Sequence, residues 1–382
     1  MAGNRDGVDH PAMSARAKSS AAATRRAEGA FGSGIAPERQ RAGRARIRLG
    51  GISTAVLLGA MLLATAVGPV NISVGDVVGT ILAHLPFLDF HTATSPVDQA
   101  IVWQLRLPRV VLAALVGAML AAGGTSYQGV LRNSLADPFL LGVAAGAGLG
   151  ATVAIVTGHG GGIVLPASAF VGAVLAVGLT YLVATSGGGP ATGYAILLAG
   201  VAIAAMLTAV QTYLQQRHTE EIRQIYNWIL GSFSVASWSD VRLVLPYVVV
   251  SAVVLLAHRR VLDVLRVGGE EAGALGIHPE RSRLIIVAAA TLGTAAAVSV
   301  SGLIGFVGII VPHAVRLAAS ASYRVVLPVS MVCGAAFLVL ADLVARTIQA
   351  PTELPVGVVT AVTGAPFFLL VLRSRRTRHG VL

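Results

Sequence analysis

Apolar stretches of about 20 residues recur along this chain, and they constrain its fold more than any motif does. A stretch of this length crosses the hydrocarbon core of a bilayer as one α-helix. Lipid offers no partner for main-chain polar groups, so a helix is the form such a stretch must take. The sequence therefore predicts an all-α polytopic membrane protein with ten transmembrane helices. They are placed at about 50–68, 108–131, 140–157, 164–185, 194–215, 241–258, 284–300, 303–319, 324–345 and 355–372.

Composition and charge agree with a membrane protein. Hydrophobic residues make up 55% of the chain, charged residues only 12%, and the mean hydropathy is +0.78. A soluble domain of 382 residues would need more charge to cover its surface. The net charge of +11 comes from arginines beside apolar stretches, without a basic face interleaved with aromatic residues. This pattern indicates a lipid bilayer as the surroundings and argues against a nucleic-acid partner.

The two ends of the chain suggest its orientation. Residues 1–47 are rich in Ala, Gly, Ser and Arg, and are predicted to form a disordered basic tail. Arginines gather just before the first apolar stretch, which by the positive-inside rule places the N-terminus in the cytoplasm. Ten spans return the C-terminus to the same side. We therefore predict a transmembrane domain over 48–382 in the cytoplasmic membrane, with arginines at the cytoplasmic C-terminus: Arg373, Arg375, Arg376 and Arg378.

Small residues at four-residue spacing occur in the second span. Such residues let two helix backbones approach closely in lipid, so they predict a tightly packed helix bundle without indicating any chemistry. The pairs are Gly117 with Ala121 and Ala118 with Ala122, followed by Gly123 and Gly124.

The fifth span carries a polar stripe. Thr208, Gln211, Thr212 and Gln215 fall at helical spacing, so one side of this helix is predicted to avoid lipid. Two interpretations stay open: hydrogen bonding between helices, or a face that lines a translocation path.

The chain lacks the motifs of several enzyme and carrier classes. Its one lysine, Lys18, does not stand in a P-loop motif, so the chain cannot hydrolyse ATP by the Walker mechanism. The metalloprotease pattern H-E-x-x-H is missing, and no catalytic residue, metal site or cofactor is predicted. An ion-coupled carrier usually needs acidic groups at mid-membrane, and here Asp342 can be neutralised by Arg346 one helical turn away. A secondary carrier or a channel remains the alternative that ATP dependence of uptake would test.

Three stretches, 106–151, 268–317 and 341–372, carry a family resemblance. They include "RLPRVVLAALVGAMLAAGG", "GGEEAGALGIHPERSR" and "ELPVGVVTAVTGAP". Together they resemble the FecCD family, the permease subunits of binding-protein-dependent ABC importers for ferric siderophores, haem and cobalamin. One departure is Ser134, where the family usually has proline, so the cytoplasmic turn is expected to be less rigid.

The resemblance implies a type II ABC importer permease fold and a set of partners. A second permease subunit, most simply a copy of this chain, would complete the path. Two separate ATP-binding cassette subunits would bind ATP and Mg²⁺ on the cytoplasmic side, and a solute-binding protein would dock outside. Ferric siderophore is the first choice of cargo on the breadth of the family, with haem and cobalamin as alternatives.

The resemblance also assigns roles to residues. Arg106 and Arg109, with Pro108 suited to a first helical turn, would dock the binding protein together with Arg346. A coupling element at about 268–283 would seat in the ATPase, and on local grounds it is predicted as two short helices broken by Gly276, with Pro279 opening the second. The stripe of the fifth span would line the path, and His313 is expected to have a structural role instead of binding haem. The remaining assignments are Glu270, Glu271, Ala274, Leu275 and Gly276 for coupling, and Asn133, Leu135, Thr192 and Gly193 for a cytoplasmic gate.

Overall fold

The computed structural model describes residues 48–84, 94–186, 193–267, 273 and 276–379. Within these ranges the chain forms helices and no strand, as predicted. The elements are the helix Arg48–Ala66, α2 (Val74–Ala83), α3 (Pro96–Ala100), the π-helix η1 (Ile101–Arg106), α4 (Leu107–Val130), the 3₁₀-helix η2 (Pro138–Leu141), α5 (Val143–Val156), α6 (Val164–Thr185), α7 (Gly193–Arg217), α8 (Ile222–Ile229), α9 (Trp238–Ala257), α10 (Arg259–Val267), α12 (Pro279–Ser301), α13 (Val307–Ala318), α14 (Tyr323–Thr347) and α15 (Val356–His379).

Seven of the described helices are long and apolar enough to cross a membrane. The stretches predicted as the third and eighth spans form the shorter apolar helices α5, with 14 residues, and α13, with 12 residues. The apolar part of α15 is also shorter than a full span. The prediction of a polytopic helical protein is therefore confirmed, whereas ten full-length spans are not. The seven are Arg48–Ala66, Pro96–Val130, Val164–Thr185, Gly193–Arg217, Trp238–Ala257, Pro279–Ser301 and Tyr323–Thr347.

The second span begins earlier than predicted. The sequence placed Pro108 in its first turn, but α3, η1 and α4 form one helix from Pro96 to Val130, which is 35 residues long. Pro108 lacks a main-chain N–H and crowds the preceding turn, so the α-helical hydrogen-bond ladder cannot pass through it unchanged. The chain widens to a π-helix just before the proline, and the N–H of Leu107 donates to the carbonyl of Val102. The proline therefore shifts the hydrogen-bond register of this helix without ending it.

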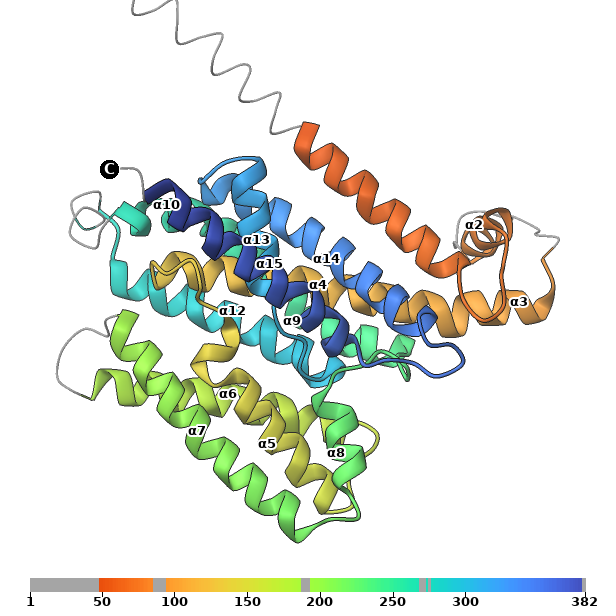
Figure 1. The fold of residues 1–382 in the computed structure, drawn as a ribbon, viewed down its shortest axis with the longest axis horizontal. Coiled ribbons are helices and arrows are strands. Elements are labelled where there is room, and N and C mark those ends of the chain that lie inside the picture. The colour runs from red at the N-terminus through yellow and green to blue at the C-terminus, as the bar shows by residue number, and fades with distance from the viewer. Residues whose placement is uncertain (1–47, 85–93, 187–192, 268–272, 274–275, 380–382) are drawn as a thin grey trace, which may run out of the picture. The chain divides into compact units, whose positions relative to one another are not determined.

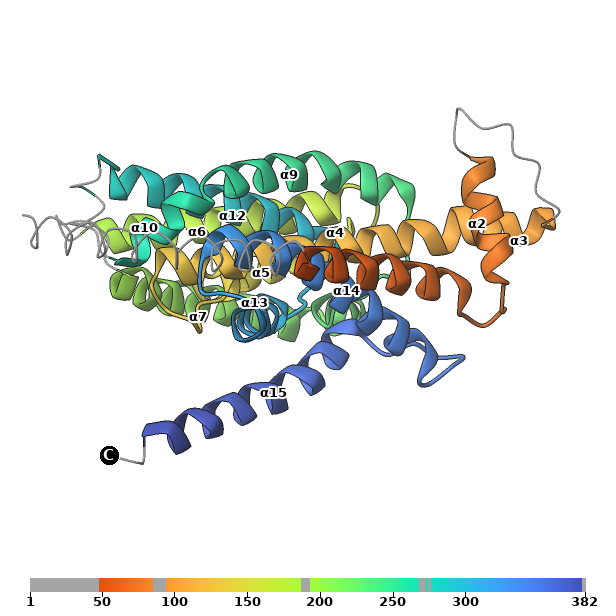
Figure 2. The same ribbon diagram turned by 90° about the horizontal axis from the view of Figure 1, so that it is seen from above.

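The helix α4 packs against α9, α12, α13 and α14, while α5, α6 and α7 pack against one another (Figure 1). The view turned by 90° shows α15 running away from the other helices beyond its contacts with α13 and α14 (Figure 2).

Glycines set the closest helix contacts of α4. A Cβ atom built on Gly117 would lie 2.3 Å from the carbonyl oxygen of Gly334 in α14. A Cβ atom on Gly124 would lie 2.1 Å from the carbonyl oxygen of Gly308 in α13. No side chain fits at either position, so the close backbone approach predicted from the small-residue pattern is confirmed.

Candidate functional site

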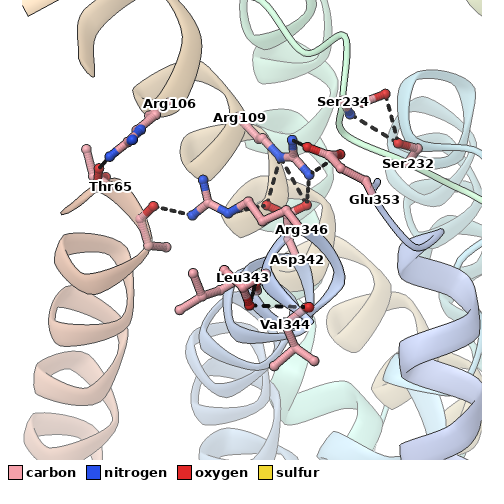
Figure 3. Close-up of polar contacts among 12 residues, drawn as sticks. Thr65, Arg106, Arg109, Ser232, Ser234, Asp342, Leu343, Val344, Arg346 and Glu353 are labelled. Carbon is pink, nitrogen blue, oxygen red and sulfur yellow. Dashed lines mark hydrogen bonds and ion pairs between the residues drawn. The ribbon is translucent and has the colours of Figure 1, made fainter. Parts of the chain in front are cut away.

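Three arginines and two carboxylates gather at the end of the bundle where α4 meets the last turns of α14. We call this group the arginine cluster: Arg106, Arg109, Asp342, Arg346 and Glu353. Arg106 and Arg109 lie on either side of the Leu107–Pro108 step, Asp342 and Arg346 lie one turn apart on α14, and Glu353 belongs to the segment between α14 and α15. Figure 3 shows the guanidinium group of Arg109 between the two carboxylates.

Arg109 is bound by both carboxylates through different edges of its guanidinium group. Its Nε and Nη2 atoms donate to Asp342 at 2.9 Å and 2.8 Å. Its Nη1 and Nη2 atoms donate to the carboxylate of Glu353 at 2.9 Å and 3.0 Å. Both contacts are bidentate, which is the geometry that a planar guanidinium favours. The side chain of Asp342 is 1% exposed and that of Glu353 is 37% exposed, so the first pair is shielded from water and the second is open to it.

Arg106 and Arg346 have a different kind of partner. The last four carbonyl groups of a helix have no N–H donor within the helix, and the C-terminal end of its dipole favours a cation. Both guanidinium groups reach the end of the helix Arg48–Ala66 and donate to such carbonyls (Figure 3). At the helix end the acceptors are the main-chain oxygens of Thr65 at 2.9 Å and Ala66 at 2.8 Å for Arg106, and that of Ala64 for Arg346. Arg106 also donates to the main-chain oxygen of Val70, in the segment that follows the helix.

The sequence assigned these three arginines to a docking surface. The structure places them in one cluster, but their residues are only 6%, 9% and 6% exposed and their donors are largely engaged within the chain. The proposed neutralisation of Asp342 by Arg346 is present, with Nε and Oδ2 3.9 Å apart. The sequence missed the pairing of Arg109 with Asp342 and Glu353, which lie 233 and 244 residues away. Its only signal was that the predicted topology places Arg109 and Glu353 on the same side of the membrane, with Asp342 inside the ninth span.

Three of the four residues assigned to the gate lie around the end of α4. The Oδ1 atom of Asn133 accepts the N–H of Leu135 at 3.0 Å, so a side-chain hydrogen bond holds the turn in which Ser134 replaces proline. Leu135 is 43% exposed. A Cβ atom on Gly193, the first residue of α7, would lie 3.2 Å from the carbonyl oxygen of Leu131. Gly193 therefore abuts the same turn, while Thr192 lies outside the described residues.

A buried carboxyl group follows this turn. Asp137 is 7% exposed, and its Oδ1 atom accepts the N–H of Phe139 at 2.9 Å, which caps η2. Burial raises the pKa of Asp137 to about 6.

The predicted coupling element differs from its sequence interpretation. Gly276 has a φ of +75° and is exposed, which fits the predicted break in the chain. Pro279 opens a helix, as predicted. That helix, however, is α12, which continues to Ser301 as a full span, because its apolar sequence carries the same helical pattern onward. The prediction of a second short helix is therefore wrong. Glu270, Glu271, Ala274 and Leu275 lie outside the described residues.

The polar stripe of α7 divides between two environments. Gln211 is buried, and a Cβ atom on Gly148 of α5 would lie 2.9 Å from its Oε1 atom, so this side chain packs between helices. Thr208 and Thr212 are exposed, and Gln215 is half-buried. Within one chain the stripe thus serves helix packing at Gln211 and leaves the two threonines on an open face.

The described residues offer no group of three or more His, Cys, Asp or Glu side chains that could hold a metal ion. His313 of α13 lies edge-on to Phe367 of α15, with the ring centroids 6.2 Å apart.

Comparisons with known proteins match most of the chain. A model of the FecCD transport family matches residues 56–374. The cobalamin import system permease of Halobacterium salinarum is 47% identical over 280 residues, which cover 73% of this chain and 75% of the relative. The hemin transport system permease of Yersinia pestis is 37% identical over 304 residues, covering 76% of this chain and 89% of the relative.

A solved structure agrees with these relatives. An inward-facing metal-chelate type ABC transporter has a TM-score of 0.75 to this chain at 28% identity, covering 86% of this chain and 99% of that one. The family match spans the arginine cluster, the turn after α4 and α7. This chain therefore belongs to the FecCD transport family and is a multi-pass membrane permease of the ABC importer class.

Proposed function

We propose that this chain is the membrane-spanning subunit of an ATP-driven importer that takes a bulky metal chelate from a solute-binding protein. The family match over residues 56–374 carries the proposal, because relatives across it are import permeases. The type II importer fold, with ten helices per subunit, belongs to the same proposal.

The proposed protein partners follow from two features of the chain, its missing Walker lysine and the open face of α7. Without a Walker lysine it depends on separate ATPase subunits, which bind ATP and Mg²⁺. The helix α7 is the least buried of the seven long helices, with 17% of its apolar window buried in the single chain. Its open face, which includes Thr208 and Thr212, is where we place the path and a second copy of the permease. The positive-inside bias supports both termini in the cytoplasm and the cytoplasmic membrane as the location.

The arginine cluster is the proposed docking site. Its three guanidinium groups and two carboxylates leave one excess positive charge within the cluster. An acidic patch on the binding protein would be steered toward this charge and oriented by it. We place this end of the bundle on the outer side of the membrane.

The cargo is proposed by chemical class. The relatives named above import cobalamin and hemin, and others import ferric citrate and ferric hydroxamates, all of which are metals held in organic chelates. Ferric siderophore, chosen from the breadth of the family, stays a prediction. Cobalamin is the second candidate, favoured by the 47% identity to a cobalamin permease.

Transport assays test the proposal. The permease and its ATPase subunits are reconstituted in proteoliposomes with the binding protein, and uptake of labelled ferric siderophore, hemin and cobalamin is followed with and without ATP. We expect accumulation of one chelate that requires both ATP and the binding protein. Accumulation driven by an ion gradient alone, or passive equilibration without ATP, would instead support a carrier or a channel.

Gly276 gives a prediction for coupling. Its positive φ strains any β-branched side chain, while no atom within 4 Å would meet a Cβ there. Gly276→Val should therefore change the local chain path at a cost of about 1–2 kcal/mol without disturbing the helix bundle. We expect ATP hydrolysis by the assembled importer to continue while chelate uptake falls by at least an order of magnitude.

The matched control is Gly162→Val, since Gly162 is equally open and has a φ of +62° but lies outside the coupling element. Both variants are compared by ATPase activity and uptake in the same proteoliposomes. Chelate uptake at the wild-type rate by Gly276→Val would contradict the proposed role of Gly276 in coupling.

A further inference from the structure

Glu353 occupies the edge of Arg109 that a docking carboxylate would need. Asp342 covers the Nε and Nη2 edge of the guanidinium group from inside the cluster. Glu353 covers the other edge, formed by Nη1 and Nη2. An incoming carboxylate can form a bidentate contact with Arg109 only on one of these edges. Docking through Arg109 therefore requires one of the two carboxylates to leave.

The two carboxylates differ in how easily they can leave. Asp342 is 1% exposed and also faces Arg346, so its departure would leave charges buried without partners. Glu353 is 37% exposed, and water can hydrate its carboxylate as soon as it lets go. It also lies outside the regular helices, on the segment that joins α14 to α15. Glu353 is the carboxylate that can be exchanged.

The other two arginines have no partner that a docking carboxylate could displace in this way. Arg106 and Arg346 are bound to main-chain carbonyls at the end of the helix Arg48–Ala66, and a carbonyl there cannot swing away as a side chain can. Of the three arginines, Arg109 is thus the one whose partner is both charged and displaceable.

We propose that Glu353 is a built-in competitor of the binding protein: it pairs with Arg109 in the resting permease, and a carboxylate of the docked partner replaces it. This inference rests on the proposed docking function. In the resting state Glu353 keeps the guanidinium group of Arg109 oriented, and it lowers the affinity for any partner that cannot supply a carboxylate at that position. Docking then breaks one exposed ion pair and forms another.

Binding measurements test the exchange. The permease complex is placed in nanodiscs, and the dissociation constant of the solute-binding protein that supports its uptake is measured at low and high salt. Glu353→Gln keeps the size of the side chain and removes its charge. Because an exposed ion pair of this kind contributes about 0.5–1 kcal/mol, we expect Glu353→Gln to bind the partner about 2- to 5-fold more tightly than wild type.

The matched control is Glu220→Gln, which removes one negative charge from an exposed residue in the segment between α7 and α8. This control shows how much of any gain in binding affinity comes from net charge alone. Tighter binding by Glu353→Gln than by Glu220→Gln, reproduced with Glu353→Ala, supports the exchange. Equal or weaker binding by the Glu353 variants overturns it. Failure of the docking function itself looks different, because wild-type binding would then be missing or insensitive to salt.

Discussion

Replacing Asp342 with alanine is expected to destabilise the permease by about 3–5 kcal/mol. Asp342 is 1% exposed and neutralises Arg109 through a bidentate contact, with Arg346 3.9 Å away. Without it, two guanidinium groups remain close together in a shielded site, and only the partly exposed Glu353 opposes them. The change would appear as a lower unfolding temperature of the detergent-solubilised protein and as loss of folded material on size exclusion.

A double-mutant cycle separates the ion pair from the effect of truncation. Arg109→Ala, Asp342→Ala and the double variant are compared, with Glu220→Ala as a surface control. We expect the double variant to be more stable than the sum of the single effects predicts, with a coupling of about 1–3 kcal/mol. Additive effects would show that the two side chains contribute independently.

Replacing Gly124 with leucine is expected to prevent α4 and α13 from packing. A Cβ on Gly124 would lie 2.1 Å from the carbonyl oxygen of Gly308 and 2.5 Å from its Cα atom. The obstructing atoms belong to the main chain, so they cannot move aside as a flexible side chain can. The cost is expected at the upper end of the range of about 1–3 kcal/mol for overpacking, and a large loss of folded permease in the membrane should follow.

Gly178→Leu provides the control for this variant. Gly178 lies inside α6, so both substitutions change a helical glycine to leucine. A Cβ atom on Gly178, however, would meet nothing within 4 Å. Membrane extracts of the two variants are compared by the yield of monodisperse protein. Equal yields would mean that helix propensity dominates and that the close approach at Gly124 is not required.

The features that could be predicted from the sequence are those that depend on residues close together in the chain. The apolar stretches gave the helices because a bilayer requires length and hydrophobicity, which are local properties. The glycines of α4 were identified because small residues at regular spacing have a clear steric consequence, and their partners Gly334 and Gly308 are also glycines. The shorter helices α5 and α13 were overestimated because apolar composition alone does not show where a helix ends.

The arginine cluster could not be predicted in full, because it depends on long-range pairing. No local pattern connects Arg109 with Asp342 or Glu353, more than 230 residues away. The family resemblance grouped the three arginines at a docking surface, and nothing in the sequence indicated that their side chains are largely buried. To predict that Arg106 and Arg346 donate to the end of another helix, one must know which helix ends beside them. Only the three-dimensional structure shows this.

The way Arg106 and Arg346 hold the helix Arg48–Ala66 has a consequence for how this helix can vary. Every acceptor in that contact is a main-chain carbonyl, so these hydrogen bonds depend on where the helix ends and not on which side chains it carries. Gly68 is restricted nearby, since a Cβ there would lie 2.7 Å from the guanidinium group of Arg106. Ala60 and Ala64 are restricted as well, because they are 5% and 0% exposed and a larger side chain would overpack the contact. The exposed face of this helix is therefore the interchangeable part: a different apolar sequence there, with the helix ending at the same point, should leave the attachment unchanged.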